Sequence, residues 1–125
     1  MIDPVTLSAL SAALDAASLR HRAGAANIAN AHTAGYVPQR VEFESLMPGA
    51  QAALARGGRL AAHDLAPPRL VSASPRSAAP YGANAVAIDQ EVAGVARNAL
   101  HYQALVKALS GQLALVETAL NDGRR

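Results

Sequence analysis

A heptad spacing of apolar residues from Ile88 to Leu120 constrains the fold of this chain more than any other sequence feature. Its members follow one another at steps of three and four residues: Val92, Val95, Ala99, Tyr102, Val106, Leu109, Leu113, Val116 and Leu120. This spacing predicts one helix with a continuous apolar stripe, here called the seam, which packs against partner helices. At ~1.5 Å per residue the helix would be ~50 Å long, too long for a globule of 125 residues to cover. The sequence therefore predicts a protein that assembles rather than one that catalyses a reaction.

The residues that flank the seam do not suit a two-stranded coiled coil in water. Such a coiled coil usually carries opposite charges at its flanks. Here the flanking positions are mostly small, amide-bearing or apolar: Ala96, Asn98, Gln103, Leu105, Ser110, Gln112, Glu117 and Ala119. We therefore expect several helices to surround the C-terminal one. It is predicted to start near Asp89, a good N-cap residue, and to end at residues 121–123.

A second long helix is predicted at the N-terminus, over residues 4–33. Asp3 can cap this helix, and Pro4 suits the first helical position, where no N–H is needed. Gly35 suits the left-handed residue that often follows a helix. The apolar stripe of this helix is again spaced at three and four residues and consists of Leu7, Leu10, Leu14, Ala17, His21, Gly24, Ile28 and Ala31.

The middle of the chain lacks a helical period. Residues 36–48 alternate weakly between apolar and polar, which favours an extended segment. Residues 49–87 are rich in glycine, proline and alanine, with two helical turns expected at 50–56 and an extended stretch at 69–74. The predicted fold is all-α: an elongated, coiled-coil-like antiparallel pair of long terminal helices with an irregular, flexible middle. The chain divides into segments 1–35, 36–87 and 88–125.

Composition excludes several classes of function. The net charge is +2 with no cysteine, and the basic residues form no stripe, which argues against nucleic-acid binding and thiolate metal sites. The four histidines lack metal-ligand spacing, and no nucleophile or phosphate-loop motif is present, so no cofactor and no small-molecule substrate are expected. Residues 23–41 loosely resemble a helix-turn-helix DNA reader, an alternative that Pro38 disfavours. Neither a cleaved secretory signal nor a membrane span is predicted.

Two separated motifs resemble the bacterial flagellar basal-body rod protein family. The first is Asn-Ile-Ala-Asn-Ala-His-Thr-Ala-Gly-Tyr at 27–36, and the second is Asn-Ala-Leu-His-Tyr-Gln at 98–103. Their order along the chain also agrees with that family: an N-terminal helix, a short variable middle and a C-terminal helix. Ala34 stands where the family usually has proline. Ala87 stands where an acidic residue is common.

The resemblance implies a structural subunit of the flagellar rod, most similar to the short protein of the proximal rod. A sister protein of the same rod family is the alternative. Implied partners are other rod proteins, the adaptor protein at the rod base, the membrane-ring base, copies of the chain itself and the flagellar type III export apparatus. Export without a cleaved signal to the rod in the periplasmic space is implied as well.

The predicted assembly interface combines the two stripes with the two motifs: Leu7, Leu10, Leu14, Asn27, Ile28, Asn30, Gly35, Tyr36, Val92, Val95, Asn98, Tyr102, Gln103, Val106, Leu109, Leu113, Val116 and Leu120. Asn27 and Asn30 have two interpretations, because asparagine either fixes the register of packed helices or terminates a helix locally. Tyr102 is expected to pack in the seam with its hydroxyl bonded to a partner, and Gln103 either contacts a neighbouring subunit or faces solvent.

Overall fold

The computed structural model of this chain describes residues 4–57, 60–61, 64–72 and 86–122. In chain order its elements are α1 (Pro4–Ala29), β1 (Gln39–Glu42), the short 3₁₀ helix η1 (Glu44–Leu46), α2 (Pro48–Ala55), β2 (Arg69–Ser72) and α3 (Ile88–Asp122). With 26 residues in α1 and 35 in α3, the two terminal helices dominate the structure. The predicted pair of long helices is therefore confirmed.

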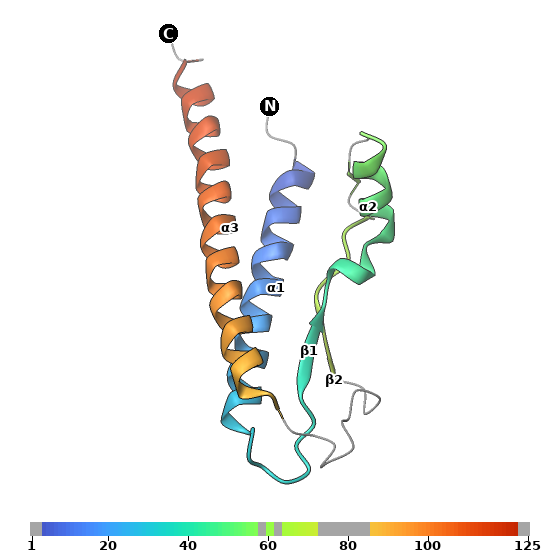
Figure 1. Cartoon of the computed structure of the whole chain (residues 1–125). Coiled ribbons are helices and arrows are strands. Elements are labelled where there is room, and N and C mark those ends of the chain that lie inside the picture. The colour runs from blue at the N-terminus through green and yellow to red at the C-terminus, as the bar shows by residue number, and fades with distance from the viewer. Residues whose placement is uncertain (1–3, 58–59, 62–63, 73–85, 123–125) are drawn as a thin grey trace.

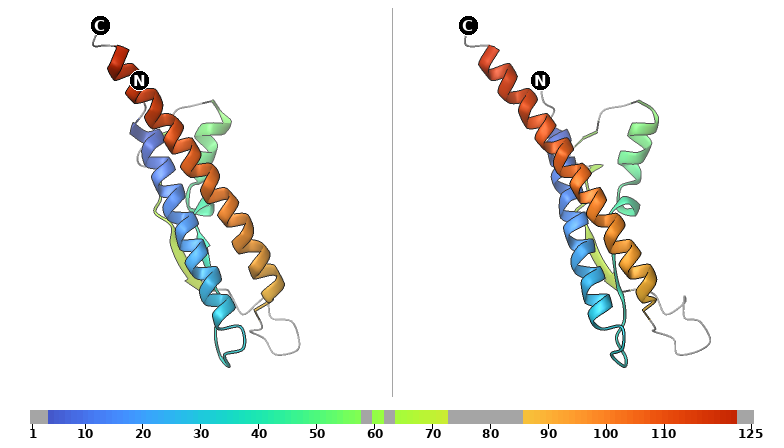
Figure 2. Two further views of the ribbon diagram at one scale, coloured as in Figure 1. Left: turned by 90° about the vertical axis from the view of Figure 1, so that its left-hand side faces the viewer. Right: turned by 60° about the vertical axis from the view of Figure 1, so that its left-hand side comes forward.

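The two long helices lie side by side and run in opposite directions (Figures 1 and 2). Near the middle of α1, and in the first third of α3, the Asn98 side chain donates a hydrogen bond from Nδ2 to the carbonyl oxygen of Ala17, at 2.7 Å. Because α3 is the longer helix, its C-terminal turns project beyond the described start of α1 (Figure 1). The molecule is accordingly elongated, as the length of the seam predicts.

α1 forms the central layer of the molecule, with α3 on one side and β1, β2 and α2 on the other (Figure 1). Its buried side chains are small or polar: Ala16, Ala17, Ala23 and Asn27. By contrast, none of the residues of α3 is buried. Among the described residues, the larger buried apolar side chains are only Phe43 and Val86, so the core is thin.

Small side chains allow α1 and α3 to approach closely. A Cβ atom built on Gly24 would lie 2.6 Å from Cγ2 of Val95, far inside van der Waals contact. Since Gly24 has no Cβ, the valine methyl occupies that space instead. The glycine in the N-terminal stripe is therefore a packing residue of the helix pair.

The middle segment contains more regular structure than predicted. β1 and β2 pair antiparallel, with Gln39 opposite Ser72 and Glu42 opposite Arg69. This two-stranded sheet is an addition to an otherwise helical fold, and its strands fall within the two segments expected to be extended. Pro48 begins α2, at a position where proline is tolerated because the first helical N–H has no partner. Residues 73–85, where much of the predicted flexibility falls, lie outside the described residues.

The ends of the long helices differ slightly from the predicted ones. α1 ends at Ala29 rather than residue 33. Beyond Ala29 the backbone forms hydrogen bonds that span only three residues, from Ala31 N–H to the Ile28 carbonyl and from Thr33 N–H to the Asn30 carbonyl. Gly35 adopts the left-handed conformation expected of it, with φ of 75°, but within the following turn. In α3, Asp89 lies in the first turn rather than at the N-cap, because the helix already begins at Ile88.

Replacing Gly24 with alanine is expected to cost about 1–3 kcal/mol in overpacking, of which the higher helix propensity of alanine offsets about 1 kcal/mol. The added methyl would collide with Val95, whose branched side chain is stiff about χ1 and cannot easily turn aside. Urea unfolding followed by far-UV circular dichroism measures the change. Gly111→Ala is the matched control, because a Cβ at Gly111 meets nothing within 4 Å.

Alanine is favoured over glycine inside a helix by about 1 kcal/mol, so the Gly111 variant should be more stable than the wild type. The Gly24 variant is therefore expected to be about 1–3 kcal/mol less stable than the Gly111 variant. Equal stabilisation by both would contradict the close approach of α1 and α3 at this point.

Candidate assembly surface

The seam of α3 divides into two rows, because α1 covers only one side of it. The inner row, at seven-residue steps, consists of Val95, Tyr102, Leu109 and Val116. The outer row, also at seven-residue steps, consists of Val92, Ala99, Val106, Leu113 and Leu120. Most of the inner row is half-buried, although Tyr102 is 42% exposed. The whole outer row is exposed, and its large side chains range from 40% at Val106 to 68% at Leu120.

Apolar exposure continues beyond the outer row on the same helix. The large apolar side chains of α3 that are at least about one-third exposed are Ile88, Val92, Leu100, Tyr102, Val106, Leu113, Leu115 and Leu120. Between Arg97 and Glu117 the single charged residue is Lys107. Monomeric proteins rarely expose so long an apolar surface with so little charge. Surfaces of this kind usually mark sites of interaction with other molecules. α3 therefore presents the main candidate surface for assembly.

The predicted interface residues of α1 are only partly covered. Leu7, Leu10, Leu14 and Ile28 are all half-buried, neither enclosed in a core nor fully open to solvent. Within this helix, the fully buried positions carry alanine, glycine and asparagine instead. The leucines thus keep part of their apolar surface available.

Asn27 connects the end of α1 to the start of β1. Its side chain is 1% exposed and donates from Nδ2 to the carbonyl oxygen of Gln39 at 2.9 Å. Its Oδ1 accepts the Gln39 N–H at 2.8 Å and the Tyr36 hydroxyl at 2.9 Å. The side-chain amide of Asn27 thereby links the end of α1 to both Tyr36 and the first residue of β1. Neither interpretation of Asn27 describes this geometry: the side chain is enclosed within its own chain, but it bonds to Gln39 and Tyr36 rather than to the last turn of α1.

Asn30 acts locally, at the end of α1. Its Nδ2 donates to the carbonyl oxygen of Ala26 at 2.9 Å, and its Oδ1 accepts the Thr33 hydroxyl at 3.3 Å. The Ala26 carbonyl also accepts the backbone N–H of Asn30 at 3.1 Å, so the side chain adds a second bond at the helix end and stabilises the next turn. Gly35, left-handed and exposed, then reverses the chain direction. The first motif is therefore a turn with a hydrogen-bonding role for both of its asparagines.

The second motif lies at a hollow between α1 and α3. This hollow of about 320 Å³ is lined by Ala17, Ser18, His21, Asn98, Ala99, Tyr102 and Gln103. The Oδ1 atom of Asn98 is buried there and has no hydrogen-bond partner among the described residues, while Nδ2 bonds to Ala17. Three predicted interface residues, Asn98, Tyr102 and Gln103, are thus brought together. Asn98 has a structural role within the chain, since it joins the two helices.

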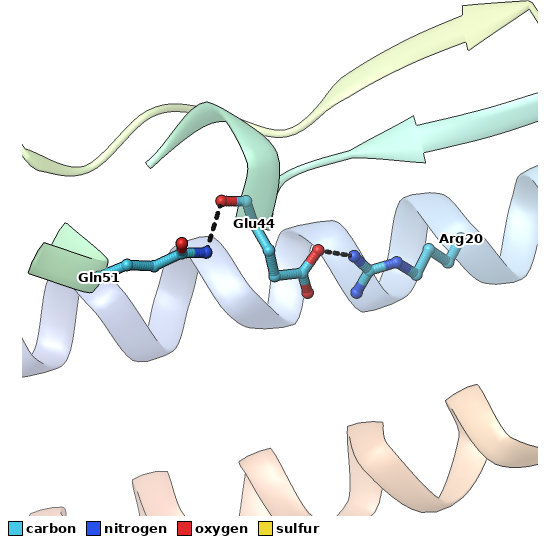
Figure 3. A network of polar contacts seen from close by, with 3 residues as sticks. All are labelled: Arg20, Glu44 and Gln51. Carbon is cyan, nitrogen blue, oxygen red and sulfur yellow. Dashed lines mark hydrogen bonds and ion pairs between the residues drawn. The ribbon is translucent and has the colours of Figure 1, made fainter. Parts of the chain in front are cut away.

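A polar network that the sequence does not reveal anchors the middle segment to α1 (Figure 3). Arg20 on α1 forms an ion pair with Glu44 of η1 at 2.5 Å. The backbone oxygen of Glu44 accepts a hydrogen bond from Nε2 of Gln51, on α2, at 3.0 Å. Because Arg20 and Glu44 are 24 positions apart, no local sequence pattern predicts that they meet.

Other kinds of site find no support in the described part of the chain. No group of three or more histidine, aspartate or glutamate side chains there could hold a metal ion. None of the helices within the described ranges is long and apolar enough to pass through a bilayer.

Comparison with known proteins identifies one informative relative. No model of a known protein family matches the chain. The chain is 28% identical over 123 residues to the flagellar basal body rod protein FlgB of Bacillus subtilis (strain 168), and the match covers 95% of each protein. The resemblance inferred from the two motifs is confirmed by this relative, which extends it to almost the whole chain.

Replacing Asn27 with alanine is expected to accelerate hydrogen exchange at the Gln39 amide by about 10- to 100-fold, because an unsatisfied buried group costs about 1–3 kcal/mol. The substitution removes all three hydrogen bonds that close the turn. Exchange measured by NMR on the full chain reports the effect residue by residue.

Tyr36→Phe is the matched control for this measurement. It removes only the hydroxyl donor and leaves both bonds between Asn27 and Gln39 in place. A smaller effect is therefore expected at the Gln39 amide. Exchange at that amide unchanged in the Asn27 variant would rule out the proposed role of the side chain in closing the turn.

Proposed function

We propose that this chain is a structural subunit of the proximal rod in the bacterial flagellar basal body, of the same kind as FlgB. The relative of that name supports the proposal because the similarity spans both proteins almost from end to end. The helix pair supports it as well, since long terminal helices with little core between them suit a building block better than a catalyst. The role is non-enzymatic.

The observation that carries the proposal is the exposed outer row of α3. Fully burying a valine or leucine side chain stabilises a protein by about 1.5–3 kcal/mol, and here several such side chains remain open to water. A neighbouring helix that covered the row would recover that free energy. Assembly is therefore the process for which this surface is suited.

The proposed interface consists of the outer row, the exposed parts of Tyr102 and Gln103, and the half-buried leucines of α1. Its neighbours would be other rod proteins, the adaptor protein at the rod base, the membrane-ring base and further copies of this chain. Residues 36–87 would form the variable middle segment between the two terminal segments 1–35 and 88–125. Export by the flagellar type III apparatus, without signal cleavage, would bring the subunit to the periplasmic rod.

Two alternatives receive less support. A sister rod protein of the FlgC type has a similar plan, but the relative found here is FlgB. A helix-turn-helix DNA reader needs a recognition helix after the turn at Gly35. The chain instead forms strand β1 at Gln39–Glu42, paired with β2. The geometry thus favours assembly over DNA binding.

Leu113→Asp is expected to abolish swimming when it replaces the wild-type chain in flagellated cells. Leu113 is 53% exposed, so the variant should retain its helices as a purified subunit, which circular dichroism can verify. Within an assembled rod the carboxylate would be buried without a partner, at a cost of several kcal/mol. Leu109 is a less informative position, because it is half-buried in the single subunit.

Ala87→Asp is the matched control, since it adds the same charge directly before the same helix, away from the outer row. Ala87 is exposed just before α3, where an acidic side chain interacts favourably with the helix dipole. Cells carrying this variant should swim normally. Normal swimming of the Leu113 variant as well would contradict assembly through the outer row.

A further inference from the structure

The C-terminal turns of α3 form an overhang, defined here as residues 113–122. The register of the helix pair follows from two contacts: Asn98 bonds to Ala17, and Val95 packs against Gly24. Counting in opposite directions from these contacts places Pro4 opposite α3 at about residues 111–115. From about residue 116 onward the overhang therefore extends past the described part of α1, as the views in Figures 1 and 2 show.

The overhang carries apolar surface with an acidic residue in its midst. Leu113, Val116, Glu117, Leu120 and Asn121 surround a shallow hollow of about 450 Å³. Leu113 is 53% exposed and Leu120 is 68% exposed. The last helical carbonyl groups add partial negative charge at this end. The overhang is thus an apolar helix end with one carboxylate at its centre, Glu117, and with Asp122 at its tip, beside Arg124 and Arg125 of the sequence.

The opposite end of the helix pair carries a groove of complementary character, here called the basic groove. It has a volume of about 400 Å³ and lies between the second half of α1, strand β1 and the first turns of α3. Its small and apolar lining residues are Ala23, Gly24, Val41 and Val95. Its charged lining residues are Arg20, Arg40, Glu91 and Arg97.

Two of these arginines are available to an acidic partner. Arg20 is already paired with Glu44. Arg40 and Arg97 are both exposed, and neither forms an ion pair with a described residue. Even with Glu91 counted, the groove keeps an excess of positive charge. A helix end with an apolar face and a carboxylate matches it in both respects.

We infer that the overhang of one copy of this chain docks into the basic groove of a second copy, with Glu117 facing Arg97 and Arg40. The inference rests on the proposed function and identifies one contact between neighbouring subunits of the rod. Because the two surfaces lie at opposite ends of the molecule, the contact is head-to-tail and leaves both outer ends free for further copies. Contacts of this type build open helical arrays rather than closed dimers.

Glu117 is the appropriate carboxylate to test. It lies in the middle of the overhang, whereas Asp122 lies at its end, beside Arg124 and Arg125 of the sequence. Glu117 also faces solvent, so changing it leaves the contacts of α3 with α1 intact.

The first experiment cross-links two full-length variants, and it benefits from the absence of cysteine in the natural sequence. Asn121→Cys places a thiol on the overhang, and Gln90→Cys places one in the basic groove. Mixed under mild oxidation, they should form a disulfide-linked heterodimer about tenfold faster than Asn121→Cys mixed with Ser11→Cys, an exposed control on α1. Equal rates in the two mixtures would overturn the inference.

The second experiment reverses the charges in the same cross-linking pair. Glu117→Arg in the overhang chain and Arg97→Glu in the groove chain should each slow cross-linking several-fold, and together they should restore it. Restoration identifies the occupant as a second copy of this chain. Loss without restoration, or no loss in either single variant, overturns the inference.

Swimming assays separate this inference from the proposed function. If both single charge reversals stop swimming and the double variant in one chain restores it, the head-to-tail contact operates in the rod. If the double variant stays non-motile and the purified copies do not cross-link, the overhang docks on a different rod protein. In that case the copy-to-copy contact is wrong and the rod function stands.

Discussion

A single helix can cover only one side of a two-sided apolar stripe, and the architecture of this chain depends on that constraint. Over the length that the two described helices share, α1 packs against the inner row of the α3 seam, and it leaves the outer row, from Val92 to Leu120, open to water. Nothing else among the described elements is placed to cover it, because β1, β2 and α2 lie on the far side of α1 (Figure 1). The proposed assembly surface is thus the part of the α3 stripe that α1 leaves uncovered.

Small side chains and single amides hold the subunit together in place of a large core. Gly24 and Ala17 bring α1 and α3 close enough for Val95 to pack and for Asn98 to bond across the pair. Asn27 then attaches the chain reversal to the end of α1. Such a subunit retains much of its apolar side-chain surface for contacts with neighbours, which is consistent with a role in a rod.

The local features of the structure could be predicted because they depend on nearby residues. Heptad spacing identified both long helices, and the alternation around Val41 indicated an extended segment. The first motif indicated a turn at Gly35, whose φ of 75° is the conformation that glycine adopts most readily. Contacts between distant residues escaped prediction. Arg20 pairs with Glu44 only because β1 returns along α1, and no spacing in the sequence encodes that path.

By itself, the sequence determined that two long helices form, where the chain turns, and which residues of α3 are apolar, since these properties depend on side-chain chemistry repeated along one helix. The tertiary structure alone decided which half of that apolar stripe is covered. It also decided that Asn27 is enclosed within its own chain and that α3 extends past the described start of α1. These outcomes depend on the register and rotation of one helix against another, which are set by packing at a few contacts such as Gly24 with Val95. The spacing of apolar residues stays the same when a whole helix shifts or rotates against its partner. The sequence pattern therefore does not determine the register or the rotation of the pair.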